Sequence, residues 1–72
     1  MSGSGFKIWR NPMSAHEGPV YLGEFAPPEG QICLYTADLV ALGFGPGSYT
    51  VRVPKLFRDQ YDVPPWQRIE LR

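Results

Sequence analysis

Cysteine and histidine are nearly absent from this chain of 72 residues: Cys33 is its one cysteine and His16 its one histidine. A single cysteine excludes an intramolecular disulfide, so the sequence is unlike the small secreted domains that disulfide bridges hold together. A metal centre normally needs three or four nitrogen, sulfur or oxygen ligands, and these two residues lie in separate segments. We therefore expect no metal site and no cofactor, with His16 on the surface and Cys33 acting as a small apolar residue in a strand.

Long apolar runs are also missing. No segment approaches the roughly 20 apolar residues that a membrane-spanning helix requires. Residues 1–5, MSGSG, lack the charged and apolar regions of a signal peptide, and they predict a flexible lead to a single domain over residues 6–72. Together with the single cysteine, these absences predict a cytoplasmic protein that makes no contact with a membrane.

The residue patterns of enzymes are absent as well. The chain contains no Ser-His-Asp pattern, no carboxylate motif and no cofactor fingerprint. The segment 43–48, GFGPGS, resembles a phosphate-binding loop only in its glycine content. Such loops follow a strand and open a helix, because the phosphate binds the free N–H groups at the helix N-terminus. Here a helix is predicted before the segment and a strand after it, so we interpret residues 45–48 as a type II turn with Pro46 and Gly47 at its centre. We predict no catalytic residues and no enzymatic activity.

Aromatic residues, by contrast, are plentiful, and they supply most of the apolar surface that so short a chain can bury. They occur mainly in short segments in which apolar and polar residues alternate, as in strands with one buried face. Gly23 within one such segment indicates a β-bulge or a close backbone approach. The predicted strands are residues 6–10, 20–25, 31–35 and 48–54, and a final strand after Pro64 and Pro65.

One short helix is predicted at about residues 36–43. Thr36 is its expected N-cap, Asp38 suits the positive end of the helix dipole, and Gly43 suits the left-handed residue after the last turn. Residues 55–61 could add one or two helical turns. The sequence therefore predicts a β-rich α+β domain of four or five short, mainly antiparallel strands with one short helix. The order of elements fits an OB-like barrel, an SH3-like barrel or a single sheet.

Positive charge is absent from the middle of the chain. Residues 11–51 contain no lysine or arginine, although the formal net charge of the whole chain is zero. An acidic face formed by this segment would attract a protein with a basic or mixed surface. If strands from the two ends pair with the middle segment, their basic residues would neutralise it instead. The candidate partner-binding residues are Glu17, Glu24, Glu29 and Asp38.

From these patterns we predict a small non-catalytic module that binds another protein, as an inhibitor, an adaptor or a structural subunit, and that could form a homo-oligomer. Such domains are common among accessory and virion proteins of bacterial viruses, which would place this one in the host cytoplasm or the virion. The alternative is a nucleic-acid-binding small barrel with aromatic platforms and a basic groove. Zero net charge disfavours it, because nucleic-acid binders usually carry a positive excess. Its candidate residues are Lys7, Trp9, Arg10, Arg52 and Arg68, with Tyr49 and Trp66 near them along the chain.

Overall fold

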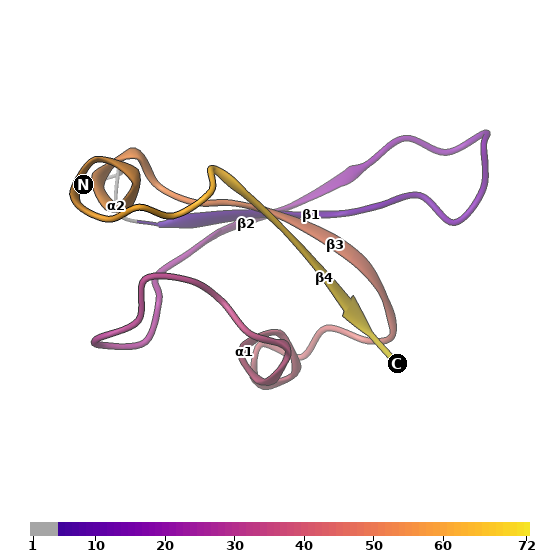
Figure 1. The fold of residues 1–72 in the computed structure, drawn as a ribbon. Coiled ribbons are helices and arrows are strands. Elements are labelled where there is room, and N and C mark those ends of the chain that lie inside the picture. The colour runs from indigo at the N-terminus through magenta and orange to yellow at the C-terminus, as the bar shows by residue number, and fades with distance from the viewer. Residues whose placement is uncertain (1–4) are drawn as a thin grey trace.

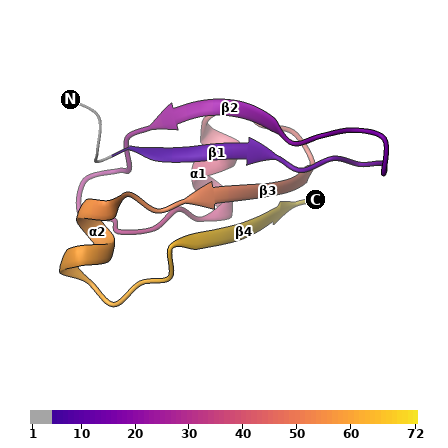
Figure 2. The ribbon, with the colours of Figure 1, turned by 90° about the horizontal axis from the view of Figure 1, so that it is seen from above.

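Four strands and two helices make up the described part of the chain, residues 5–72 of the computed structural model (Figure 1). The strands form one antiparallel sheet in the order β2-β1-β3-β4, with β2 and β4 at its edges (Figure 2). The predicted β-rich fold is confirmed in the form of a single sheet. Of the predicted N-terminal lead, residues 1–5, all but Gly5 lie outside the described residues. The elements are β1 (Phe6–Arg10), β2 (Val20–Phe25), α1 (Thr36–Ala41), β3 (Gly47–Arg52), α2 (Lys55–Gln60) and β4 (Trp66–Leu71).

One face of the sheet carries the hydrophobic core. Strand alternation turns Phe6 and Ile8 of β1 toward this face, together with Tyr49 and Val51 of β3. All four side chains are fully buried. Burial of each such side chain stabilises the fold by roughly 1.5–3 kcal/mol. The other buried members of the core are Leu34, Leu39, Val53 and Ile69.

Helix α1 lies over this face of the sheet and contributes the fully buried Leu39 to the core (Figure 1). Its N-cap is Tyr35 and not the predicted Thr36. The Tyr35 backbone N–H donates a hydrogen bond of 2.8 Å to Oδ2 of Asp38, so the carboxylate satisfies an N–H group at the start of the helix. Gly43 follows the helix with a φ of 90°, as predicted for a left-handed residue at this end.

Helix α2 closes one end of the core. It begins after the buried Pro54, and the ring of Phe57 packs on that of Phe6 with centroids 5.8 Å apart. The residues predicted to add a helical turn thus form a second short helix. With six residues each, the helices of the described region are too short to cross the hydrocarbon core of a bilayer.

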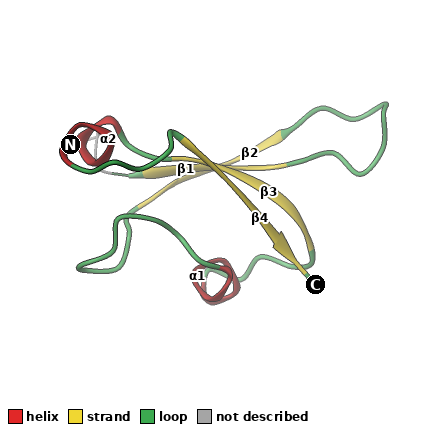
Figure 3. Cartoon of the chain, viewed as in Figure 1, coloured by secondary structure: helices red, strands yellow, loops and turns green. Residues whose placement is uncertain are grey.

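The predicted strand over residues 31–35 is wrong, because this segment is a loop that leads into α1 (Figure 3). The backbone of this loop is hydrogen-bonded to a side chain of β4 and not to a neighbouring strand. Gln67 Nε2 donates to the Leu34 carbonyl at 3.0 Å, and Gln67 Oε1 accepts from the Leu34 N–H, also at 3.0 Å. These bonds satisfy the backbone of the buried Leu34. Residues 26–30 therefore do not join two paired strands, and the sheet has four strands.

The segment GFGPGS connects the end of α1 to the start of β3, in the order predicted from its residues. It does not form the predicted type II turn. Gly47 is the first residue of β3 and has a φ of 152°. The Gly45 carbonyl accepts a hydrogen bond of 2.6 Å from the Tyr49 hydroxyl, so a core side chain holds this loop in place.

Replacement of Gly47 by alanine should lower the free energy of unfolding by about 1–3 kcal/mol, because residues with a Cβ rarely adopt this φ. Gly45→Ala is the control, since Gly45 has no positive φ and an added Cβ would meet nothing within 4 Å. Urea denaturation of both variants measures the difference. Equal stabilities would contradict the strained role of Gly47.

Replacement of Gln67 by alanine should cost about 1–3 kcal/mol of stability, because the N–H and carbonyl groups of buried Leu34 would lose their partners. Gln60→Ala, at the exposed end of α2, is the matched control. Hydrogen exchange should show faster exchange of the Leu34 amide in the first variant alone. Unchanged protection of this amide would show that the two bonds do not hold the loop.

Candidate functional site

The face of the sheet opposite α1 carries polar and aromatic side chains, and we call it the open face. In Figure 2 the strands lie in front of α1, while α2 lies beyond their ends. The strand register shows that the side chains of the open face form two rows across the four strands. The first row is Glu24, Lys7, Arg52 and Trp66, and the second row is Tyr21, Trp9, Thr50 and Arg68.

Three aromatic side chains form a cluster on the open face. The ring of Trp9 lies 5.2 Å from that of Tyr21 and 5.8 Å from that of Trp66, measured between centroids. Trp66 is 48% exposed and Tyr21 is 52% exposed. A cavity of about 230 Å³ beside the cluster is lined by the two tryptophans together with Asn11, Pro19 and Thr50. The cluster therefore exposes aromatic surface on which a flat ligand could stack.

A β-bulge brings Tyr21 to the open face. The register of β1 and β2 shifts after Ile8, which lies opposite Gly23, so that Trp9 lies opposite Tyr21. Gly23 adopts a φ of 127°, and Leu22 packs against the core. Of the two alternatives predicted for Gly23, a bulge or a close backbone approach, the structure shows the bulge. The bulge changes which side chains of β2 reach each face, as bulges commonly do.

The floor of the cluster is fixed by hydrogen bonds from Asn11, which follows β1. Its Nδ2 donates to the Ser48 hydroxyl at 3.1 Å, and its Oδ1 accepts from the Thr50 hydroxyl at 2.9 Å. The Asn11 backbone N–H also donates to the Ser48 carbonyl at 2.9 Å. These three bonds join the end of β1 to β3 beneath the aromatic rings, so the rings lie on a rigid support.

Two arginines lie beside the aromatic cluster. The guanidinium of Arg52 lies 4.5 Å from the ring centroid of Trp66, which is a cation–π contact. Arg68 forms a 3.4 Å ion pair with Glu70, and both side chains are mostly exposed to water. Such exposed pairs contribute little stability and exchange readily for another ligand.

The structure brings together four of the five residues predicted for the nucleic-acid alternative. The exception is Arg10, which alternates to the other side of the sheet at the end of β1. Tyr49, which is near them in sequence, belongs to the core. Sequence reasoning missed Tyr21, for which the signal was the bulge glycine two residues later. The four residues on the open face are Lys7, Trp9, Arg52 and Arg68.

The four predicted acidic residues are distributed over different parts of the fold. Glu17 lies in the loop between β1 and β2, and Glu29 lies in the turn after β2. Glu24 lies on the open face opposite Lys7 of β1. Asp38 lies on α1 and accepts hydrogen bonds from Gln31 and from the backbone of Tyr35. Their part in partner binding stays a prediction.

The two residues with metal-binding or nucleophilic chemistry lie apart from the open face cluster. His16 is exposed in the loop between β1 and β2, and Cys33 is a half-buried free thiol in the loop before α1. Within residues 5–72, no three histidine, cysteine or acidic side chains are grouped closely enough to hold a metal ion. The cysteine is thus not in the strand that the sequence predicted.

No family model, curated protein or solved structure matches this chain. Function is therefore inferred from the geometry of the open face.

Alanine at Gly23 should strain the bulge, because a side chain disfavours a φ of 127°. We expect a loss of about 1–3 kcal/mol in unfolding free energy and a weaker near-ultraviolet circular dichroism signal from the Trp9–Tyr21 pair. Gly18→Ala is the control, since Gly18 has open space around it and no positive φ. An unchanged aromatic signal in Gly23→Ala would contradict the role of the bulge in placing Tyr21.

Proposed function

We propose that this protein is a non-catalytic binding module that holds a single-stranded nucleic acid on its open face. The observation that carries the proposal is the exposed cluster of Trp9, Tyr21 and Trp66 among the cations of the open face. Proteins that bind single strands combine aromatic platforms for the bases with basic side chains for the phosphates. A sheet face with central aromatic residues is one of the arrangements that perform this task.

A single strand fits this surface better than a duplex. The aromatic rings can stack only on bases whose faces are free, whereas the bases of a duplex stack on one another. The cavity lined by Trp9 and Trp66 lies over Thr50 of β3, which is one of the two central strands of the sheet. A base resting over this cavity could stack on the ring of Trp66, which is 48% exposed.

The distribution of charge answers the objection raised by zero net charge. The open face carries Lys7, Arg52 and Arg68, and Lys55 and Arg58 continue this positive charge onto α2. The carboxylates in these regions are Glu24, Glu70 and Asp59, so the cations are in excess. The remaining acidic residues lie in loops and on α1. Affinity for a polyanion depends on the local surface that neutralises the phosphates.

A second candidate is binding of another protein with a basic or mixed surface through the side of α1 that faces solvent. Val40 is 62% exposed and Leu42 is 41% exposed, next to a small apolar cavity of about 150 Å³ that Leu34 and Leu42 help to line. The Asp38 carboxylate lies at the same cavity and would favour a basic partner. This candidate uses the opposite side of the molecule from the open face.

Binding of a mixed-sequence DNA single strand of about 12 nucleotides tests the first candidate, since small single-strand-binding domains cover roughly 4–16 nucleotides. Trp66→Ala should weaken binding by about 1–3 kcal/mol, which is the usual contribution of one stacked base. Tyr35→Ala is the control, because Tyr35 is 58% exposed beside α1. Fluorescence anisotropy at low salt measures both. Absence of binding by the unaltered protein would refute the proposal.

The salt dependence of the same binding tests the charges. Arg68→Gln should reduce the slope of log affinity against log salt by about 0.7, the value expected for each neutralised phosphate of a single strand. The double change Glu24→Lys and Glu29→Lys should not weaken binding to DNA. If Val40→Lys on α1 impairs association with a protein partner and leaves DNA binding unchanged, the second candidate is favoured instead.

A further inference from the structure

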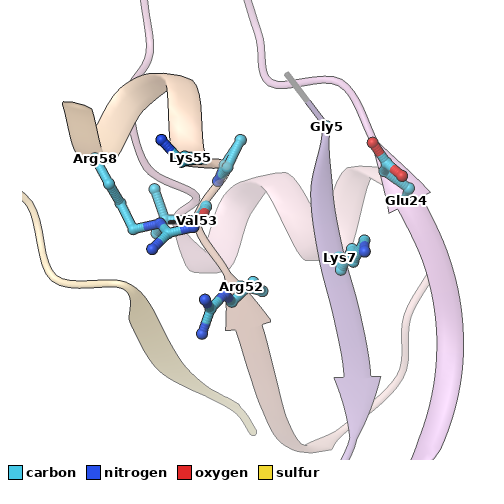
Figure 4. Close-up of a pocket in the computed structure, with 8 residues that line it drawn as sticks. Gly5, Lys7, Glu24, Arg52, Val53, Lys55 and Arg58 are labelled. Carbon is cyan, nitrogen blue, oxygen red and sulfur yellow. Dashed lines mark hydrogen bonds between the residues drawn. The ribbon is translucent and has the colours of Figure 1, made fainter. Parts of the chain in front are cut away.

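A second feature of the open face lies at its end near α2, where a cavity of about 350 Å³ is formed. Lys7 of β1 and Arg52 of β3 line it from the sheet, and Lys55 and Arg58 line it from α2 (Figure 4). This volume falls within the range of roughly 300–1,000 Å³ that is typical of small-ligand sites. Four cations from three elements therefore surround one cavity. Its other lining residues are Gly5, Glu24, Val53 and Pro54.

Most of this positive charge has no carboxylate partner within the described residues. Lys55 forms a 2.9 Å ion pair with Asp59 on the exposed surface of α2. Lys7, Arg52 and Arg58 form no ion pair with any of residues 5–72. Glu24 is the one carboxylate of the lining, and it lies across from Lys7 in the sheet. Like charges around one cavity repel one another, so a bound anion would stabilise the arrangement.

The cavity is built on rigid backbone. Val53 is 1% exposed, and its N–H donates to the Pro65 carbonyl at 2.9 Å. The carbonyl of the same residue accepts a 3.1 Å hydrogen bond from Nε of the half-buried Arg58. This bond fixes the plane of the guanidinium and leaves its terminal N–H groups for a ligand. Gly5 lies against the side chain of Glu24 at this edge of the cavity.

We infer that this cavity binds a phosphate group. A phosphate offers several charged oxygens at once, which suits two guanidinium groups and two ammonium groups better than a singly charged anion does. Arg52 joins the cavity to the aromatic cluster, because its guanidinium also lies on the ring of Trp66. A base stacked on Trp66 would thus place its phosphate beside the cavity. The assignment of this phosphate to a nucleic acid rests on the proposed function. The cavity itself does not, since a free polyphosphate could fill it without a nucleic acid.

Titration with inorganic pyrophosphate at low salt tests the site without a nucleic acid, with binding followed by calorimetry. Lys7→Gln and Arg58→Gln should each lower the affinity about tenfold or more, because each removes a charge-assisted contact. Lys7 makes no hydrogen bond or ion pair through its side chain with the described residues, so its variant should fold normally even if Arg58→Gln does not. Arg10→Gln is the control, because it removes the same charge outside the cavity.

Competition then identifies the source of the phosphate. If pyrophosphate displaces the DNA single strand and Lys7→Gln weakens both ligands, a backbone phosphate occupies the cavity. Pyrophosphate binding without displacement of the strand supports the cavity as a site for free phosphate compounds. Failure of the strand to bind at all would refute the proposed function and leave the pyrophosphate result standing. Absence of pyrophosphate binding, or an equal loss in Lys7→Gln and Arg10→Gln, would overturn the inference.

Discussion

Burial of one face of the central strand pair is the constraint on which the rest of this structure depends. Phe6 and Ile8 of β1 lie beside Tyr49 and Val51 of β3, and none of these side chains is exposed to solvent. In so short a chain, α1 is the helix that covers the sheet, and α2 is used to close one end of the core. The chain can therefore bury one face of its sheet, and the other face is left for polar and aromatic side chains.

The same alternation that builds the core sets the chemistry of the open face. Every second residue of β1 and β3 is turned away from the core, which places Lys7 and Trp9 beside Arg52 and Thr50. The bulge at Gly23 adds Tyr21 to this surface and returns Leu22 to the core. Aromatic and basic side chains gather on one rigid support, which is the arrangement that binding to an unpaired strand requires.

The junction between β3 and α2 links the two proposed parts of the ligand site. Arg52 is the last residue of β3, and its guanidinium lies on the ring of Trp66. The next residue, Val53, accepts a hydrogen bond from the side chain of Arg58 through its carbonyl. Aromatic surface and phosphate-binding charge are thus adjacent through one short connection. In this arrangement the aromatic cluster would set affinity for bases, and the cavity would set the position of the phosphate chain.

Local patterns in the sequence determined the strands at either end of the chain and the inward direction of Tyr49 and Val51. They also determined the helix end at Gly43 and the bulge at Gly23. These features could be read locally because strand alternation and glycine conformation act over a few residues. Tertiary structure decided what lies far apart in sequence. The loop at residues 31–35 reads as a strand, yet the Gln67 side chain satisfies its backbone from β4. The four acidic residues of the segment without lysine or arginine lie in different parts of the fold. Basic residues from the two ends of the sequence, in contrast, line one cavity. A one-dimensional pattern fixes the side to which a strand residue points, but only the pairing order β2-β1-β3-β4 fixes its neighbours across the sheet.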